Sequence, residues 1–337
     1  MGHKLITCTG FGGTGSSVVS DLMTEFNSVK SCGDFEFGIS AEIDGISDLQ
    51  HYIVDDFNCV KVTEAIYRFR RHSRIISKGY SSVLGCDTQK IFNDYIDELV
   101  DVKWMGSNNL QVLRFGWFHR KWYGLCCRLK MYYSKLTTSN NGYERGYKKP
   151  KMLIELAQDE DKFFLATRKM YKRLLDSLDP DDKYKFLCFD RLVSTNNYKR
   201  YCNYFDDIKV IYVDRDPRDL YLLNQLYWHE GWIPSEDVEV FINWFRTIRK
   251  NLKRDIKDAE SGTLLCIMLE DAIYNYDETI KKIIDFIGLN EKDHINKHQF
   301  FNPNYSIRNT KLWEKTNAYK ENVERIKKDL SDFCYPY

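Results

Sequence analysis

A short glycine-rich segment near the start of the chain has the composition of an anion-binding loop. Residues 10–17 read Gly-Phe-Gly-Gly-Thr-Gly-Ser-Ser, and they lie between an apolar β-type run at 4–9 and a helical pattern at 18–26. Glycines allow successive backbone N–H groups to turn inward, and the N-terminus of the following helix adds the positive end of its dipole. The segment therefore predicts phosphate binding without a side-chain cation.

The spacing of these glycines is compatible with two kinds of nucleotide site. In a Walker loop the last glycine, Gly15, would be followed by a lysine that reaches the β and γ phosphates. Ser16 stands there instead, which weakens an ATPase or GTPase interpretation. The glycines also match the G-x-G-x-x-G pattern of dinucleotide-binding domains, with Asp34 or Glu36 at the distance of a ribose contact. The loop alone leaves both interpretations open.

Two later segments add a second anion site and further strands. Residues 209–214 form an apolar run typical of buried parallel strands, and Arg215 follows it directly. Pro217 can open a helix at its first turn, so Arg215 is expected at the carboxyl end of a central strand, beside the glycine loop. The planar guanidinium group of Arg215 suits bidentate phosphate binding. Residues 264–269 predict another buried strand, followed by a helix over 277–286.

In this order, the segments resemble the sulfotransferase family that uses 3′-phosphoadenosine 5′-phosphosulfate (PAPS) as donor and releases the bisphosphate PAP. The resemblance is carried by residues 10–17, 210–219, 269–271 with 286–289, and 308–313. It implies a three-layer α/β/α fold with a central, mainly parallel sheet and a P-loop-like first strand, loop and helix. The alternation of helical and strand patterns along the chain agrees with that α/β class.

The resemblance also assigns residues to the donor. In the family the first loop holds the 5′-phosphosulfate, which corresponds here to Gly12, Gly13, Thr14, Gly15, Ser16 and Ser17. The arginine after the central strand holds the 3′-phosphate, which assigns that role to Arg215. A late Arg/Lys/Trp stretch closes over the adenosine, and this role is assigned to Arg308 and Trp313. No metal is expected at this site.

The chain departs from the family at two positions. Where the family's loop usually carries Lys or Arg, two residues before Gly15, this chain has Gly13. Backbone donors are expected to supply part of the missing leaving-group stabilisation. The family places a serine eight residues after the arginine, where this chain has Leu223, and Asn224 is the expected hydrogen-bonding substitute. These departures keep open a binding protein that has the fold without the activity.

The resemblance implies transfer of a sulfuryl group to a hydroxyl group. The aspartates flanking Arg215 and the segment 42–49 look most like bacterial enzymes that sulfate surface polysaccharide or lipopolysaccharide. The expected acceptor is therefore a carbohydrate, either a bacterial surface glycan or its lipid-linked precursor. Two other enzyme classes stay open. A P-loop kinase-like phosphotransferase is disfavoured by the missing lysine, and an NAD(P)-binding Rossmann oxidoreductase leaves residues 215–219 unexplained.

Sulfuryl transfer to a hydroxyl group needs a base near the acceptor oxygen. Base candidates are expected where strands end at the ligand crevice. The loop after the second strand offers Glu42 and Asp44, with His51 a few residues on, and the strand ending at Asp190 offers another carboxylate. We expect Glu42 to be the catalytic base, and Asp44 to be the second choice. Asp271 is expected to anchor a helix N-terminus instead.

Residues 114–151 combine positive charge with aromatic side chains. Ten Lys and Arg residues stand against one acid, Glu144, and five Trp and Tyr residues are interleaved over 117–133. Such a segment suits the stacking of sugar rings or contact with an anionic membrane. The alternative is a solvated helical hairpin whose aromatics belong to the core. Residues 138–146 are expected to form a mobile loop or lid.

The composition of the chain indicates its number of domains, its location and its cysteine chemistry. With 337 residues, of which 43% are hydrophobic, the chain can bury one α/β core, and we expect a single domain with a helical insertion at about 60–180. No run of 18 apolar residues occurs, so a cytoplasmic protein, at most peripheral at the inner face of the membrane, is expected. Ten scattered cysteines without a C-x-x-C pair indicate neither a zinc site nor a disulfide framework. No nucleic-acid partner is expected.

The patterns also predict the order of the elements. Strands are expected at 4–9, 35–41, 185–190, 209–214 and 264–269. Helices are expected at 16–27, 60–72, 88–101, 161–178, 218–229, 235–257, 277–287 and 317–332.

Overall fold

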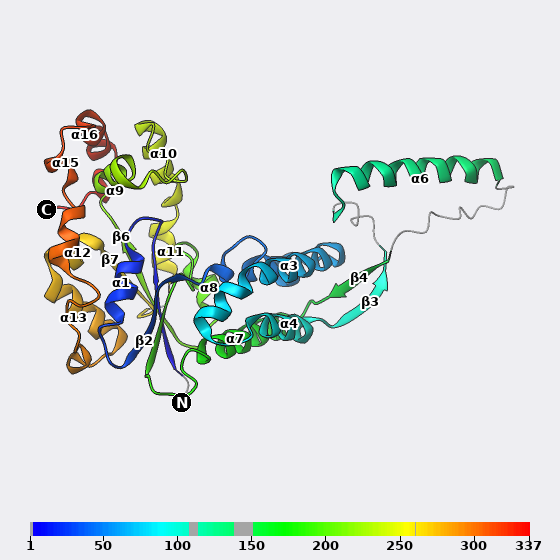
Figure 1. Cartoon of the computed structure of the whole chain (residues 1–337), viewed down its shortest axis with the longest axis horizontal. Helices are drawn as coiled ribbons and strands as arrows, with labels where there is room; N and C mark the ends of the chain where they lie inside the picture. Colours follow the sequence, from blue (N-terminus) through cyan, green and yellow to red (C-terminus); the bar gives the residue numbers. More distant parts are fainter. Residues whose placement is uncertain (1–2, 108–113, 138–150, 260) are drawn as a thin grey trace.

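A parallel β-sheet forms the centre of the molecule (Figure 1). The computed structural model describes residues 3–107, 114–137, 151–259 and 261–337. Within these residues the sheet has five strands in the order β2-β5-β1-β6-β7, and every neighbouring pair is parallel. The strands are β1 (Lys4–Thr9), β2 (Val29–Glu36), β5 (Phe186–Asp190), β6 (Ile208–Asp214) and β7 (Leu264–Met268).

Helices cover both faces of this sheet. Along β5, Phe186 and Cys188 belong to the core on one face, and Leu187 and Phe189 belong to the core on the other. A parallel strand buried on both sides needs apolar residues at consecutive positions, as its sequence has. The first face is covered by α1 (Ser16–Met23), α12 (Leu269–Tyr274) and α13 (Tyr276–Ile287). The second is covered by α2 (Ile46–Gln50), α3 (Cys59–Leu84), α7 (Glu160–Asp176), α8 (Tyr198–Cys202) and α11 (Leu252–Asp258). The predicted three-layer α/β/α fold is confirmed.

A smaller group of helices lies beyond the carboxyl ends of the strands (Figure 1). Phe241 and Phe245 pack there with Leu220 and Ile326 in a core of their own. The two aromatic side chains are thus used for packing. The members of the group are α9 (Pro217–Leu223), the π-helical turn η3 (Asn224–Trp228), α10 (Val238–Ile248), α15 (Leu312–Lys315) and α16 (Lys320–Asp329), with α14 (Pro303–Ser306) preceding α15.

The chain between β2 and β5 extends away from the sheet (Figure 1). Helices α3, α4 (Thr88–Leu99) and α7 pack side by side through residues such as Phe69, Phe92 and Met170. Beyond them, β3 (Val102–Gly106) pairs antiparallel with β4 (Met152–Leu156), and α6 (Trp117–Thr137) lies near the far end of that ribbon, away from the sheet. The sequence did not predict β3 and β4. The division into one domain with an insertion at 60–180 stays a prediction.

Several element boundaries differ from those expected. The second strand ends at Glu36 instead of running to residue 41, because Phe37 and Ile39 are buried from a loop and a short 3₁₀ turn, where Phe37 packs against Tyr80. The helix expected at 218–229 ends at Leu223 and continues as η3. The helix expected at 235–257 is divided into α10 and α11.

A buried ion pair fixes the end of β6. Arg249 donates two hydrogen bonds to Asp214, at 3.0 Å from Nε and 2.6 Å from Nη2. The Asp214 carboxylate also accepts from the hydroxyl group of Tyr212 at 2.6 Å and from the backbone N–H of Arg215 at 2.9 Å. The Arg249 guanidinium lies 4.3 Å from the ring centroid of Phe11, a residue of the glycine loop. One carboxylate therefore organises the strand end and supports the loop.

Replacing Arg249 by alanine should destabilise the protein by about 3–5 kcal/mol, because the buried Asp214 carboxylate loses its cation. Arg325→Ala is the control, since Arg325 pairs with Glu239 while both side chains are about half exposed. It should cost less than about 1 kcal/mol. Urea unfolding followed by circular dichroism measures both values, and equal losses would contradict the role assigned to the pair.

Candidate functional site

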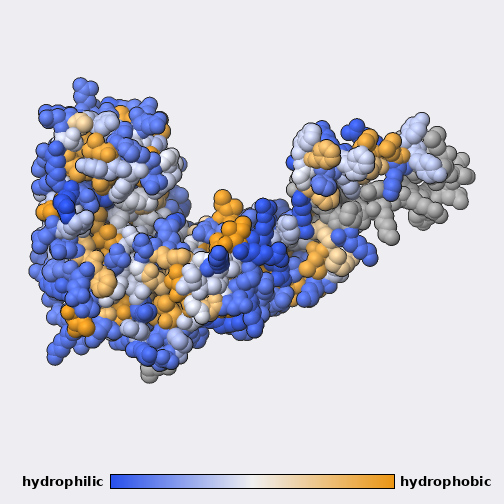
Figure 2. Space-filling view, viewed as in Figure 1, coloured by the Kyte–Doolittle hydropathy of each residue, from blue (hydrophilic) through white to orange (hydrophobic). Residues whose placement is uncertain are grey.

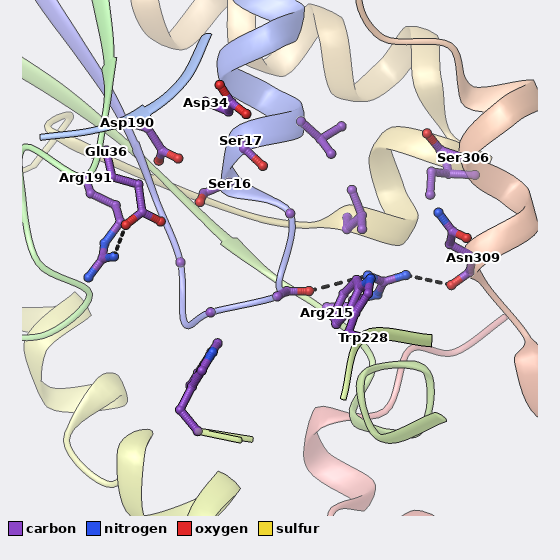
Figure 3. A pocket seen from close by; sticks show the side chains of 18 residues that line it. Ser16, Ser17, Asp34, Glu36, Asp190, Arg191, Arg215, Trp228, Ser306 and Asn309 are labelled. Carbon is purple, nitrogen blue, oxygen red and sulfur yellow. Dashed lines mark hydrogen bonds and ion pairs between the residues drawn. The ribbon is translucent and has the colours of Figure 1, made fainter. Parts of the chain in front are cut away.

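A cavity of about 710 Å³ opens at the carboxyl ends of the strands (Figure 3). Parallel strands place their following loops at one edge of the sheet, so segments distant in the sequence meet there. The cavity is lined by the glycine loop and the start of α1, by the ends of β2, β5 and β6, by the segment after α9, by α12, and by Ser306 and Asn309. Its lining residues include Gly10, Gly12, Gly13, Gly15, Ser16, Ser17, Asp34, Glu36, Asp190, Arg191, Arg215, Trp228, Trp232, Leu269, Ser306 and Asn309.

The glycine loop adopts a backbone conformation that side chains disfavour. Gly13 has a φ of 77°, and a Cβ atom added there would lie 2.8 Å from the ring of Trp228 and 2.9 Å from Leu220. Gly15, with a φ of 96°, is the N-cap of α1, whose first turn contains no acidic residue. The positive end of the helix dipole is therefore directed at the cavity without a carboxylate in the first turn to neutralise it.

Arg215 emerges from β6 beside this loop and is 3% exposed. Its Nη2 donates to the carbonyl oxygen of Asn309 at 2.6 Å, and its Nη1 donates to that of Gly13 at 3.4 Å (Figure 3). The Nε atom has no hydrogen-bond partner among the described residues. Burial lowers the pKa of this guanidinium, opposed by Glu270. A buried cation with an unused donor is a site for an anion.

The aspartates around Arg215 are already engaged. Asp214 pairs with Arg249, and Asp216 pairs with Arg218 at 2.5 Å. Asp219 accepts from the backbone N–H groups of residues 311 and 312, and from the hydroxyl group of Tyr337. Because these aspartates have other partners, the Arg215 guanidinium has no direct ion pair among the described residues.

Glu270 lies behind Arg215 and is fully buried. One carboxyl oxygen accepts from the backbone N–H of Asp216 at 3.1 Å, and the other has no partner among the described residues. Burial raises the pKa of Glu270 to about 8, although Arg215 acts in the opposite direction. Burial thus disfavours the charged form of Glu270, which weakens the compensation that it offers to the charge of Arg215.

The opposite side of the cavity is acidic. Asp190, at the end of β5, is 1% exposed, and its Oδ1 atom has no partner in the described chain. Burial, with a smaller contribution from Glu36, raises the pKa of Asp190 to about 7. Glu36 forms an ion pair with Arg191, and Asp34 lies nearby (Figure 3). The cavity thus has a cationic side at Arg215 and an acidic side at Asp190.

Most of the predicted donor residues line this cavity. Five loop positions and Arg215 do so, namely Gly12, Gly13, Gly15, Ser16, Ser17 and Arg215. Thr14 is buried and is not among the lining residues, and its N–H donates to the carbonyl of Phe11 at 3.0 Å. Thr14 therefore stabilises the turn of the glycine loop and does not face the cavity.

The remaining predicted donor residues lie outside the lining of the cavity. Asn224 is buried and bonds to Glu230, Ile233 and Ser235, so it holds the segment after α9 together. Arg308 is exposed and its guanidinium stacks 3.7 Å from the ring centroid of Tyr305. Trp313 packs 4.0 Å from the guanidinium of Arg218, which is therefore buried. A donor role for Asn224, Arg308 and Trp313 stays a prediction.

The two carboxylates expected to act as base also lie outside the lining. Glu42 pairs with His72 at 2.8 Å, and Asp44 pairs with Arg68 at 2.8 Å. Because β2 ends at Glu36, both residues lie beyond a 3₁₀ turn and contact α3 instead of the cavity. Their catalytic role stays a prediction.

Sequence reasoning missed the tryptophans of the cavity. A Cβ atom on Gly12 would meet the ring of Trp232 at 1.7 Å, and the ring of Trp228 lies 5.8 Å from the Arg215 guanidinium. Both belong to the stretch Trp-His-Glu-Gly-Trp at 228–232. Two tryptophans with a glycine between them, soon after the anion-binding strand, were the available signal. Asn309 had none, because it contributes a backbone carbonyl.

No protein-family model and no curated protein matches the chain significantly. Among solved structures it is similar to the sulfotransferase domain from the curacin biosynthetic pathway, with 13% identity, a TM-score of 0.43 and 98% of both chains covered. The sulfotransferase domain of the Synechococcus PCC 7002 olefin synthase matches with 10% identity and a TM-score of 0.43, over 98% of this chain and 94% of that one.

Retinol dehydratase in complex with androsterone and inactive cofactor PAP matches with 13% identity and a TM-score of 0.33, over 99% of this chain and 82% of that one. The two sulfotransferase domains belong to the family that the sequence resembles. TM-scores of this size carry no argument about function, which has to follow from the residues of the cavity.

Substitution of Gly13 should be more harmful than substitution of a glycine with similar backbone angles in open space. Gly85 has a φ of 67° and no atom within 4 Å of an added Cβ. Gly85→Ala should cost only the conformational penalty, about 1–2 kcal/mol. Gly13→Ala adds the clash with Trp228 and Leu220, a further 1–3 kcal/mol or so. Chemical unfolding measures both, and equal losses would contradict the close packing described for the loop.

Proposed function

We propose that the chain is a PAPS-dependent sulfotransferase that transfers a sulfuryl group to a hydroxyl group of a carbohydrate. One observation carries the proposal: the glycine loop and the buried Arg215 guanidinium line the same cavity, and Arg215 retains an unused donor. A donor with a phosphosulfate at one end and a 3′-phosphate near the other needs two anion sites in one cavity. The resemblance in sequence assigns these two roles to these two segments.

The residues of the cavity suit such a donor. The loop N–H groups and the start of α1 would hold the 5′-phosphosulfate, and Arg215 would hold the 3′-phosphate. The cavity volume of about 710 Å³ is within the usual range for small-molecule sites. When bound, PAPS supplies the activated sulfuryl group, and the protein orients it for in-line attack. Backbone dipoles of the loop would take the place of the Lys or Arg that the family usually carries where this chain has Gly13.

We assign the general base to Asp190, ahead of Glu42 and Asp44. Asp190 lines the cavity, whereas Glu42 and Asp44 are paired with His72 and Arg68 outside it. A pKa near 7 suits a group that must be deprotonated at neutral pH and yet accept a proton in the transition state. The acceptor hydroxyl would approach from the acidic side of the cavity and give its proton to Asp190.

The acceptor that we propose is a surface glycan or its lipid-linked precursor. Trp232 lines the cavity and is 51% exposed, so part of its ring is available to a sugar. Aromatic faces stack well against the apolar face of a pyranose. The resemblance of residues 42–49 to glycan-sulfating enzymes supports the same acceptor class.

The rival functions explain fewer of these residues. A kinase-like phosphotransferase would use a lysine in the loop, and the described lining of the cavity contains none. A nicotinamide-dependent oxidoreductase gives no role to the buried Arg215. A protein that binds PAPS without transferring sulfate would share the donor site but would not need the acidic side, so a sulfate-transfer assay distinguishes it.

Arg215→Ala should weaken PAP binding by about 2–4 kcal/mol, because a charge-assisted contact with the 3′-phosphate is lost. AMP has no 3′-phosphate, so its affinity should change much less. Arg215→Lys should retain part of the PAP affinity, since it keeps the charge without the planar fork. Isothermal titration of both ligands tests this, with the distant Arg325→Ala as control. Equal losses of PAP and AMP affinity in Arg215→Ala would contradict the assignment.

Asp190→Asn should lower kcat/KM by about 10²–10⁴-fold. In the unmodified enzyme kcat/KM should fall as the pH drops below about 7, because protonation of Asp190 removes the base. Glu42→Gln is the matched comparison and should leave the rate and its pH profile nearly unchanged. Large activity loss in Glu42→Gln with retained activity in Asp190→Asn would reverse the assignment.

The free energy of unfolding of Asp190→Asn, measured against pH, gives an independent test of the raised pKa of Asp190. The pKa of Asp190 is raised on folding, so the folded state loses stability as the pH rises from about 4 to about 7. Asp190→Asn removes this loss, and it should therefore be more stable than the unmodified protein at pH 8, by an amount that shrinks toward pH 5.

A further inference from the structure

Helix α6 carries a row of large apolar side chains that no described part of the chain covers. Phe118, Trp122, Leu125, Leu129 and Tyr132 are between 47% and 73% exposed. Their spacing of four, three, four and three residues places them on one face of a helix. Figure 2 shows hydrophobic residues along α6, at the far end of the molecule from the sheet. The interpretation of this segment as a hairpin with its aromatics in the core is therefore wrong for α6.

The charge of α6 is entirely positive. Its 21 residues contain five Lys and Arg residues and no Asp or Glu. Two of the cations, Lys121 and Arg128, immediately adjoin the apolar row when α6 is drawn at 100° per residue. Lys121 lies 6.0 Å from the ring centroid of Trp117. Basic residues beside an aromatic and aliphatic face are typical of helices that lie in the headgroup region of an anionic membrane.

The position of α6 suits such contact. Arg114, just before the helix, pairs with Glu64 of α3 at 2.9 Å and stacks 3.8 Å from the ring centroid of Tyr67. The start of α6 is thus held by α3, while the helix itself lies apart from the sheet (Figure 1). Among the described residues, no helix has the length and apolar character needed to cross a bilayer.

We propose that α6 is an interfacial helix that docks the protein on an anionic lipid membrane, with Phe118, Leu125 and Leu129 inserted among the headgroups. An acidic polysaccharide would be attracted by the cations but would gain little from an aliphatic row. Pairing with a second copy of α6 would bring ten cations together. The inference needs neither the donor nor the sulfuryl transfer, so it can fail while the proposed function holds.

The test is co-sedimentation of the full chain with vesicles. We expect binding to phosphatidylcholine vesicles that contain about a third phosphatidylglycerol, and weak binding to phosphatidylcholine alone. Raising the salt from about 0.1 M to about 1 M should release the protein, since the screening length falls from about 10 Å to about 3 Å. Brominated lipid in the mixed vesicles should quench tryptophan emission, because Trp117 and Trp122 lie on α6.

Paired variants separate α6 from the rest of the surface. The double variant Leu125→Glu with Leu129→Glu should bind mixed vesicles at least about tenfold more weakly. Leu165→Glu is its control, because Leu165 of α7 is 68% exposed and lies on another helix. All these residues are exposed, so the melting temperature should not change.

The charge variants follow the same design. Reversal of Lys121 and Arg128 to Glu should weaken vesicle binding at least about 20-fold, since each surface cation contributes about fivefold. The control reverses Lys281 and Lys282, which are exposed on α13.

Four results would overturn the proposal. The first is equal binding of the protein to charged and neutral vesicles, and the second is a loss of vesicle binding in the control variants as large as in the α6 variants. The third is binding of the protein to dextran sulfate but not to vesicles. The fourth is formation of a dimer that the variants of Leu125 and Leu129 disrupt. Lys148 and Lys149 of the basic segment, and the expected lid at 138–146, lie outside the described residues, so none of the variants rests on them.

Discussion

The burial of one guanidinium group constrains the whole site. Arg215 is removed from water without a carboxylate in direct contact, and its hydrogen bonds go to two backbone carbonyls from opposite ends of the chain, Gly13 and Asn309. A buried charge of this kind is costly unless something neutralises it. Burial of Arg215 therefore favours the binding of an anion beside it. The glycine loop and the C-terminal segment around Asn309 are held where that anion would lie.

The surrounding acids are arranged so that this preference persists. Asp214 and Asp216 form ion pairs with Arg249 and Arg218, and burial raises the pKa of Glu270. Across the cavity, burial gives Asp190 a proton affinity suited to taking a proton from a hydroxyl group. A buried cation and a buried carboxyl group thus lie on different sides of one cavity, as the proposed function requires.

The parts of the site that depend on local chain geometry could be predicted from the sequence. The glycine loop and Arg215 are such parts, since a strand followed by a turn places them at the sheet edge whatever the rest does. Glu42 and Asp44 were expected at that edge because the second strand was expected at 35–41, whereas it spans Val29–Glu36 and brings Glu36 to the edge instead. Trp232 had a signal in the spacing of residues 228–232 that was not used, whereas Asn309 reaches the cavity through long-range packing and contributes only a backbone carbonyl.

The order of the strands also has a consequence for how the chain reaches its native state. β1 occupies the middle of the sheet, yet its partners are β5 and β6, and Lys4 pairs with Phe186. During synthesis at about 5–20 residues per second, the first strand waits roughly 10–40 s for its neighbours. Its backbone N–H and C=O groups are unpaired and its apolar side chains uncovered meanwhile, so refolding should be slow and sensitive to aggregation, and early contact with a chaperone should raise the yield.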